Sequence, residues 1–249
     1  MTGPLILYES RLLDAVPVAS STAAGFDVLN LRDMRDYTLW KPSAMPATVT
    51  VDSGSSKAAD YLAVYGHDLF STGCTIEVRK STDNFAANDV LVATSTPADN
   101  KTLLLLFTSA SSRYWRIRVL TGTAPTLSIA LLGVRLEMPK GVKDLLDPLG
   151  HTVKAEYNRS VTGRPLGKVI QYREWKANLI FEALTWDFIR ASWVPAWDAW
   201  LQSEPWLFAW HPDSYPKESY LVVADGSYSS PHDSNLTLTL TVPVTGVIP

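Results

Sequence analysis

Apolar and polar residues alternate in short runs over the first 137 residues of the chain. Turn sequences such as Asp52-Ser53-Gly54 and Thr121-Gly122 separate the runs at intervals of about ten residues. This rhythm is typical of an all-β sandwich. The predicted strands are 47–52, 61–65, 75–80, 102–107, 114–120 and 126–137.

The alternation also predicts which faces of the strands are buried. Trp115, Ile117 and Val119 alternate with arginines, so their strand has one apolar face and one wet face. The run 103–107 reads Leu-Leu-Leu-Leu-Phe and does not alternate. That strand is therefore expected to be covered on both faces.

The pattern changes after residues 138–150, a segment with two prolines and two glycines. Beyond it, Thr185 is a good N-cap, and apolar residues then recur at three- and four-residue spacing to about Ser203. This predicts one helix, which Pro195 is expected to kink or divide. The predicted strands of this part are 151–158, 168–182, 206–210, 218–224 and 235–242.

The sequence thus predicts a mainly β protein with two domains. We expect an N-terminal jelly-roll β-sandwich over 1–137, a linker over 138–150, and a C-terminal α+β split barrel with one helix over 151–249. A chain of 249 residues is long enough to bury two such cores. The first residues do not read as a signal peptide, and no apolar run approaches the ~20 residues that cross a bilayer, so we expect no membrane span.

Composition and charge exclude several classes of function. The chain carries 22 basic and 25 acidic side chains, and the basic ones do not cluster. Phosphate recognition needs a local excess of Lys and Arg, so we expect no nucleic-acid binding. A single cysteine, Cys74, excludes an internal disulfide and a thiolate zinc cluster.

Catalytic and metal-binding motifs are also missing. The four histidines are scattered, and the sequence has neither a Gly-x-Ser-x-Gly elbow nor a glycine-rich phosphate loop. Two acid pairs, Asp33 with Asp36 and Glu174 with Glu182, could be nominated for glycoside hydrolysis, but solvated turn and strand residues are the favoured interpretation. We expect no enzyme activity, no cofactor and no metal site.

Two segments of the N-terminal part resemble a known family. Residues 30–40 read NLRDMRDYTLW and residues 113–118 read RYWRIR. With these motifs at matching spacing, residues 5–137 resemble the discoidin or coagulation-factor C-type family of galactose-binding-like sandwiches. The resemblance implies loops at one end that hold a ligand, commonly a carbohydrate, and we take Asp33, Arg35 and Tyr37 as the candidate ligand residues.

Residues 30–40 also differ from the family pattern at one point. Family members that bind structural calcium have Gly-Asp where this chain has Met34-Arg35. This loop loses an oxygen ligand and gains a cation, so we expect no calcium site there. Trp40 is interpreted as a buried plug under the sandwich.

The order of elements in the C-terminal part resembles the tube and hub domains of long-tailed bacteriophages. The resemblance implies a ring of three or six copies around a channel, partners among tail-tube and hub or fibre proteins, and a place at the virion tail tip after synthesis in the host cytoplasm. Open sheet edges are a liability unless another chain pairs with them, which agrees with a ring. Asn235, Thr237, Thr239 and Thr241 are the candidate channel-facing residues.

Seven of the nine tryptophans lie between residues 175 and 210. The favoured interpretation is an aromatic core, in which Trp193, Trp197 and Trp200 of the helix pack on a sheet face bearing Leu236, Leu238 and Leu240. The alternative places Trp186, Trp206 and Trp210 at subunit contacts, where aromatic residues are enriched.

Two hypotheses for the function follow. The first is a structural protein of a phage tail tip that forms a ring and presents its sandwich to neighbouring proteins or host-surface carbohydrate. The alternative is a carbohydrate-binding, lectin-like module with an accessory domain.

Overall fold

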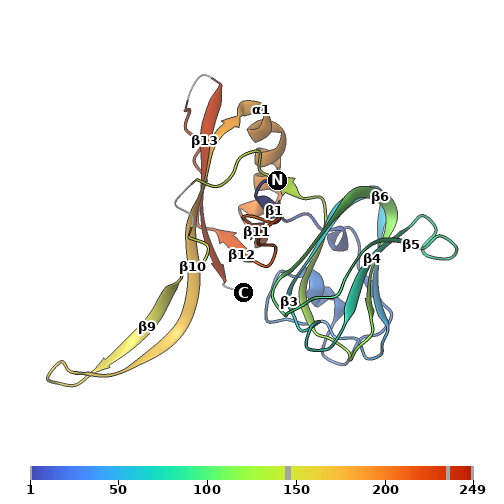
Figure 1. Ribbon diagram of the computed structural model, residues 1–249, viewed down its shortest axis with the longest axis horizontal. Helices are drawn as coiled ribbons and strands as arrows, with labels where there is room; N and C mark the ends of the chain where they lie inside the picture. Colours follow the sequence, from blue (N-terminus) through green and yellow to red (C-terminus); the bar gives the residue numbers. More distant parts are fainter. Residues whose placement is uncertain (1, 144–146, 234–235, 248–249) are drawn as a thin grey trace.

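The computed structural model describes residues 2–143, 147–233 and 236–247. The protein is mainly β, as expected, with two sheets and one long helical segment (Figure 1). The first sheet contains β2 (Val18–Ala19), β3 (Ala47–His67), β4 (Thr75–Ser81), β5 (Val90–Ser95), β6 (Leu103–Leu120) and β7 (Leu127–Gly133). The second contains β1 (Leu5–Leu7), β8 (Leu136–Glu137), β9 (Thr152–Arg159), β10 (Pro165–Thr185), β11 (Trp206–Ala209), β12 (Ser219–Ala224) and β13 (Thr237–Val247).

Two long strands, β3 and β6, build both layers of the N-terminal sandwich. Their first pairing, 47–52 with 114–119, belongs to a layer with the order β2-β3-β6-β4-β5. The register then shifts, and the remaining parts of β3 and β6 form a second layer in which β7 also pairs with β3. The separately predicted strands 47–52 and 61–65 are therefore two parts of one strand, and β5 was not predicted at all.

The second layer is covered on both faces. Leu103, Leu105 and Phe107 pack on the core between the two sandwich layers. Leu104 and Leu106 pack instead on a core that the sandwich shares with the seven-stranded sheet. Both faces of this strand therefore meet apolar partners, which explains the missing alternation and confirms that prediction.

The seven-stranded sheet draws strands from both ends of the chain. Its order is β8-β1-β11-β12-β13-β10-β9, and every neighbouring pair is antiparallel. In β1, Ile6 lies opposite Phe208 and packs on the helix side, whereas Leu5 and Leu7 face the sandwich. The sandwich is thus inserted between the first strand of this sheet and its remaining strands.

Residues 186–201 form one helical segment that we call the tryptophan helix, made of α1 (Trp186–Phe188), η3 (Ile189–Trp193), α2 (Val194–Ala196) and η4 (Trp197–Leu201). Thr185 caps it as expected, because its hydroxyl accepts a hydrogen bond from the Phe188 amide at 3.3 Å. The turns η3 and η4 are wide π turns on either side of Pro195. Proline lacks an amide donor, and these wide turns take up the disruption where the sequence predicted a kink.

The tryptophan helix packs on one face of the seven-stranded sheet. Trp193, Trp197 and Leu201 are buried in one cluster with Leu238 and Leu240, which confirms the aromatic-core interpretation for these residues. Trp200 is half-buried against the same cluster. Leu236 was expected in this core, but it precedes β13 and is 79% exposed. Asn235 lies outside the described residues.

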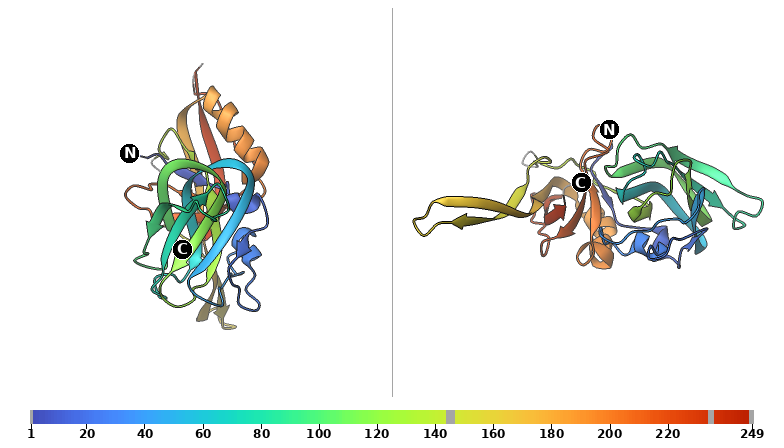
Figure 2. Two further views of the ribbon diagram at one scale, coloured as in Figure 1. Left: turned by 90° about the vertical axis from the view of Figure 1, so that its right-hand side faces the viewer. Right: turned by 90° about the horizontal axis from the view of Figure 1, so that it is seen from below.

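The end of the sheet formed by β9 and the outer part of β10 projects from the rest of the molecule as a long hairpin (Figure 1, Figure 2). We call residues 152–174 the arm. Every residue from Val161 to Arg173 is exposed. No helix in the described ranges is long and apolar enough to cross a membrane.

Candidate functional site

The loop that carries the predicted ligand residues is shaped by Asp33. This residue ends η2 (Val28–Arg32), and its carboxylate accepts hydrogen bonds from the Arg35 amide at 3.0 Å and the Thr38 hydroxyl at 2.8 Å. Between them, Met34 adopts a left-handed conformation with φ 58° and is buried. Asp33 therefore fixes the loop, and it does not line the groove described next.

Arg35 and Tyr37 line a groove of about 490 Å³ between this loop and the seven-stranded sheet, which we call the junction groove. Tyr37 is 75% exposed. Tyr172 and Glu174 of β10 contribute to the same groove. The structure thus brings two of the three predicted residues together with a strand that lies far along the chain, and no local sequence motif connects these two segments.

Three of the four acids considered for hydrolysis have polar partners of their own. Glu174 contacts Lys176 at 3.2 Å, and Glu182 contacts Lys143. Asp33 is bonded within its own loop. A glycosidase needs two carboxyl groups that share a substrate site. Neither predicted pair lines one groove together, but Asp36 and Glu174, one member of each pair, both line the junction groove.

An apolar core adjoins the junction groove, because Met34 and Leu221 belong both to the lining of the groove and to this core. Tyr61, Ile129 and Leu131 of the sandwich are buried against Leu207 and Leu221 of the seven-stranded sheet. Burial of this kind holds side chains at close-packed density. The two walls of the groove are therefore set before any ligand arrives.

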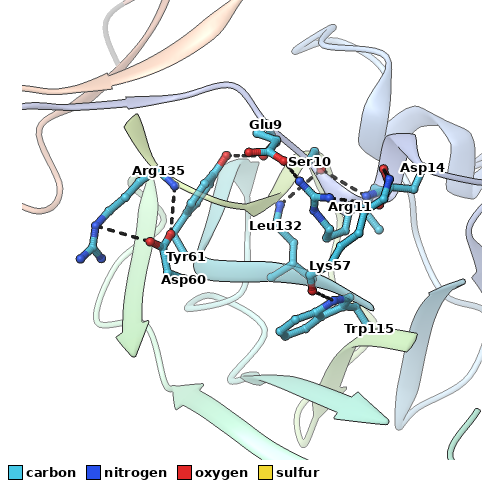
Figure 3. A network of polar contacts seen from close by, with 11 residues as sticks. Glu9, Ser10, Arg11, Asp14, Lys57, Asp60, Tyr61, Trp115, Leu132 and Arg135 are labelled. Carbon is cyan, nitrogen blue, oxygen red and sulfur yellow. Dashed lines mark hydrogen bonds and ion pairs between the residues drawn. The ribbon is translucent and has the colours of Figure 1, made fainter. Parts of the chain in front are cut away.

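The chain crosses between the two sheets in two segments, and polar contacts hold both segments against β3 (Figure 3). The Arg11 guanidinium is buried and contacts the carboxylates of Glu9 and Asp14, and Lys57 contacts Asp14 at 2.7 Å. The Tyr61 hydroxyl donates to the carbonyl of Glu9. Burial holds the pKa of Tyr61 well above its usual value, so this donor keeps its proton.

The second crossing is fixed in a similar way. After β7 the chain turns toward β8, and there the amide of Arg135 donates to the carboxylate of Asp60 at 2.9 Å (Figure 3). Because both crossings are tied to the same strand, the sandwich and the seven-stranded sheet are joined at two points.

The arm presents an apolar and basic surface. Its exposed large apolar residues are Tyr157, Val161, Leu166, Val169, Ile170 and Tyr172. Five Lys or Arg and two Glu lie within 152–174, a net charge of 5 − 2 = +3, whereas the whole chain has −3. The rest of the chain therefore carries −3 − 3 = −6. β9 is also the terminal strand of its sheet, so its outer edge has no partner strand in the described residues.

The three tryptophans proposed for subunit contacts differ in exposure. Trp206 is fully buried in the core under the tryptophan helix, so it offers no surface to another copy and that expectation is wrong. Trp186 is half-buried, with Arg190 over its ring at 5.2 Å. Trp210 is half-buried and donates to Glu218 at 2.8 Å. An interface role for Trp186 and Trp210 stays a prediction.

Metal and thiol chemistry find no support in the described residues. No group of three His, Cys, Asp or Glu side chains there is placed to hold a metal ion. Cys74 is buried, and burial raises the pKa of its thiol. Since the thiolate is the reactive form, this cysteine is an inert core residue.

No family model matches the chain, and no curated protein matches it in sequence. Several solved carbohydrate-binding modules are similar to about half of it in structure. Chitosan-binding module 1 of a Paenibacillus sp. IK-5 chitosanase/glucanase has 21% identity and a TM-score of 0.43, with 50% of this chain and 98% of the module covered. The family 32 module of Clostridium perfringens NanJ, in complex with galactose, has 15% identity and a TM-score of 0.43, with 52% and 98% covered.

A third similar structure is the family 32 module of AlyQ in complex with 4,5-unsaturated mannuronic acid, with 20% identity and a TM-score of 0.39 over 47% of this chain and 93% of the module. The solved structures similar to this chain thus include carbohydrate-binding modules, and at these TM-scores we draw no conclusion about a ligand from them. The resemblance to phage tail hubs rests on the order of elements and stays a prediction.

Proposed function

We propose that this chain is a non-catalytic assembly protein that associates with copies of itself through the seven-stranded sheet and its arm. The observation that carries the proposal is the arm, which exposes six large apolar side chains and covers no core of its own. Exposed apolar surface on this scale and a free strand edge both favour a protein partner.

Charge favours another copy of the chain as that partner. The arm carries +3 and the rest of the chain −6. A basic arm of one copy is therefore attracted to the acidic body of the next, and the attraction favours head-to-tail contacts. Head-to-tail contacts close into a ring when their rotation permits it.

The finer proposal is a ring component of a long-tailed bacteriophage tail tip, with three or six copies around the channel and the sandwich presented outward. The order of elements supports it, together with a sandwich inserted between β1 and the rest of the seven-stranded sheet. Its partners would be tail-tube and hub or fibre proteins.

Negative-stain imaging of the full chain tests this proposal. We expect rings with a central hole. The matched variant replaces residues 155–171 by Asn-Gly, a sequence that suits a two-residue hairpin turn and joins Lys154 to its register partner Tyr172. This variant should give only particles of the size of one chain. Rings that form equally well without the arm would show that assembly does not need the arm.

The junction groove favours a second candidate function, carbohydrate binding. Tyr37 and Tyr172 offer exposed aromatic faces, on which the apolar face of a sugar ring stacks, and Arg35 and Glu174 offer hydrogen-bonding groups beside them. The apolar core that adjoins the groove agrees with a preformed site.

Glycan-array binding by the full chain tests the second candidate. Tyr37→Ala and Tyr172→Ala should each weaken binding, whereas Tyr157→Ala, which removes an exposed tyrosine outside the groove, should not. Binding that survives both groove substitutions would exclude the groove as the sugar site.

A further inference from the structure

A second groove lies on the outer face of the first sandwich layer, opposite the sandwich core. It has a volume of about 450 Å³ and is lined by β2, β3, β6 and the loop between β4 and β5. We call it the Arg116 groove. Its lining includes Val18, Ser20, Thr48, Thr50, Tyr114 and Arg116.

Arg116 differs from the arginines around it. Arg79, Arg113 and Arg118 each have a carboxylate partner, namely Asp89 at 2.6 Å, Asp52 at 2.7 Å and Glu77 at 3.9 Å. No carboxylate in the described part of the chain lies within ion-pair distance of the Arg116 guanidinium. Its Nε donates to the Thr50 hydroxyl at 3.0 Å, so the two terminal nitrogens are the donors left for a ligand.

The surroundings of Arg116 are unfavourable for its positive charge. Burial lowers the pKa of Arg116, because the surroundings disfavour its charged form and no carboxylate compensates fully. An arginine nevertheless stays charged at neutral pH. A half-buried cation without an anionic partner is therefore prepared to bind one.

The loop between β4 and β5 positions an aromatic ring over this cation. The Arg116 guanidinium carbon lies 3.6 Å from the centre of the Phe85 ring. Phe85 and the preceding Asn84 both have left-handed backbones, with φ of 64° and 56°. Two consecutive non-glycine residues in this region are strained, and such strain persists where the surroundings enforce it.

The enforcing contacts are present. The Phe85 amide donates to the hydroxyl of Ser81, a fully buried residue, at 2.8 Å. The carboxylate of Asp83 accepts from the amides of Ala87 at 2.9 Å and Asn88 at 3.0 Å. These hydrogen bonds thus hold the loop in its strained backbone conformation. In this conformation the Phe85 ring lies over the Arg116 guanidinium.

We propose that the Arg116 groove binds an acidic saccharide, with the carboxylate of a hexuronate unit paired to the Arg116 guanidinium. The planar guanidinium accepts a carboxylate in a two-bond geometry. The hydroxyls of Ser20, Thr48 and Thr50 suit sugar hydroxyls, and Val18, which is 67% exposed, and the Tyr114 ring suit the apolar face of a pyranose.

One acidic residue lines the same groove, but its charge is already compensated. Both carboxylate oxygens of Asp52 accept from Arg113, at 2.7 and 2.8 Å. This pair holds the pKa of Asp52 near 2. The unpaired charge of the groove is therefore that of Arg116, and a sugar acid matches it better than a neutral sugar.

This inference goes beyond the proposed assembly role and does not depend on it. The Arg116 groove shares no lining residue with the junction groove. The two sites are therefore separable by substitution.

Isothermal titration of the full chain tests the proposal, with trimers of galacturonate, glucuronate and mannuronate as probes. Their methyl esters, which keep the sugar and lose the charge, and inorganic phosphate are the reference ligands. At least one uronate should bind, and its ester should bind about 10- to 100-fold more weakly, the range for a lost charge-assisted hydrogen bond. Arg116→Met should weaken uronate binding by a similar factor.

Two controls separate the site from its surroundings. Arg118→Met removes a neighbouring arginine outside the groove, and Tyr157→Ala removes an exposed tyrosine that lines neither groove; both should leave uronate binding unchanged. Phe85→Gly suits the left-handed backbone, so it should keep or raise the melting temperature while it weakens binding about threefold or more.

Several outcomes would overturn the proposal. These are no binding of any uronate at millimolar concentration, equal binding of a uronate and its ester, preference for phosphate over every uronate, or full affinity in folded Arg116→Met. Loss of binding in Tyr37→Ala but not in Arg116→Met would instead assign the sugar to the junction groove.

Discussion

The two halves of β10 show how one strand serves two different environments. In the inner half, residues 175–185, Trp175, Leu179, Phe181 and Leu184 are buried under the tryptophan helix. In the outer half, residues 165–174, every residue but Glu174 is exposed. Both halves are paired antiparallel to a neighbour, so the hydrogen bonding of the strand does not distinguish them.

The two halves of β10 differ in what their apolar side chains contact. The inner half alternates, because one face meets a core and the other does not. The outer half carries Val169 and Ile170 as adjacent residues on opposite faces, with no core on either side. The fold does not require these apolar residues, and a protein partner would account for them.

The largest effect should come from a core substitution in the inner half. Phe181→Ala removes a fully buried ring and should lower the free energy of unfolding by about 3–5 kcal/mol. The matched change in the outer half, Val169→Ala, should stay within about 0.5 kcal/mol, because that side chain is 57% exposed. Urea unfolding of both variants at low protein concentration measures the two losses of unfolding free energy. Losses of similar size would contradict the prediction.

A charge introduced into the outer half of β10 should affect self-association and leave the free energy of unfolding unchanged. Ile170→Glu places a carboxylate on the arm and should weaken self-association by about tenfold or more, because an interface must then desolvate an unpaired charge. Its unfolding curve at low concentration should match that of the unchanged protein. Sedimentation velocity over a dilution series gives the readout, and unaltered association would mean that this face of the arm is not buried in the assembly.

The charge of the arm predicts a smaller, salt-dependent effect. Lys168→Glu changes the arm from +3 to +1 and should weaken association severalfold at low salt. The difference from the unchanged chain should shrink toward 0.5 M salt, where charges are screened. A salt-independent difference would point to lost packing instead of lost attraction.

The smallest effect lies where the two halves meet. The carboxylate of Glu174 raises the pKa of Lys176 above its usual 10.5. The stabilisation is complete below that value and is lost as the pH rises through the folded pKa, so the ion pair contributes at neutral pH. NMR titration should show the pKa of Lys176 falling toward 10.5 in Glu174→Gln, and an unchanged pKa would show that the pair does not form in solution.

The sequence predicted local features better than long-range ones. Alternation identified the buried face around Trp115, and the missing alternation at 103–107 correctly predicted a strand covered on both faces. The N-cap at Thr185 is also confirmed. These features depend on neighbours within a few residues, which a pattern records.

The features that sequence reasoning missed depend on contacts between distant segments. Nothing near Leu5 indicates that β1 pairs with β11, and nothing near Tyr37 indicates that Tyr172 lies across a groove. Trp206 was named as an interface candidate in the alternative interpretation because aromatic residues are enriched at subunit contacts, but its register with Val222 places it in the core. The Arg116 groove was missed because the sequence does not show which arginines have a carboxylate partner in the fold.

In the proposed function, the arm makes this chain assemble with itself. Light scattering on the full chain at high micromolar concentration, beside the variant with residues 155–171 replaced by Asn-Gly, tests it most directly. We expect about 82 or 165 kDa, three or six times the 27.5 kDa chain, and a monomer for the shortened arm. A monodisperse mass of 27.5 kDa for the unchanged chain, or an oligomer that persists without the arm, would contradict it.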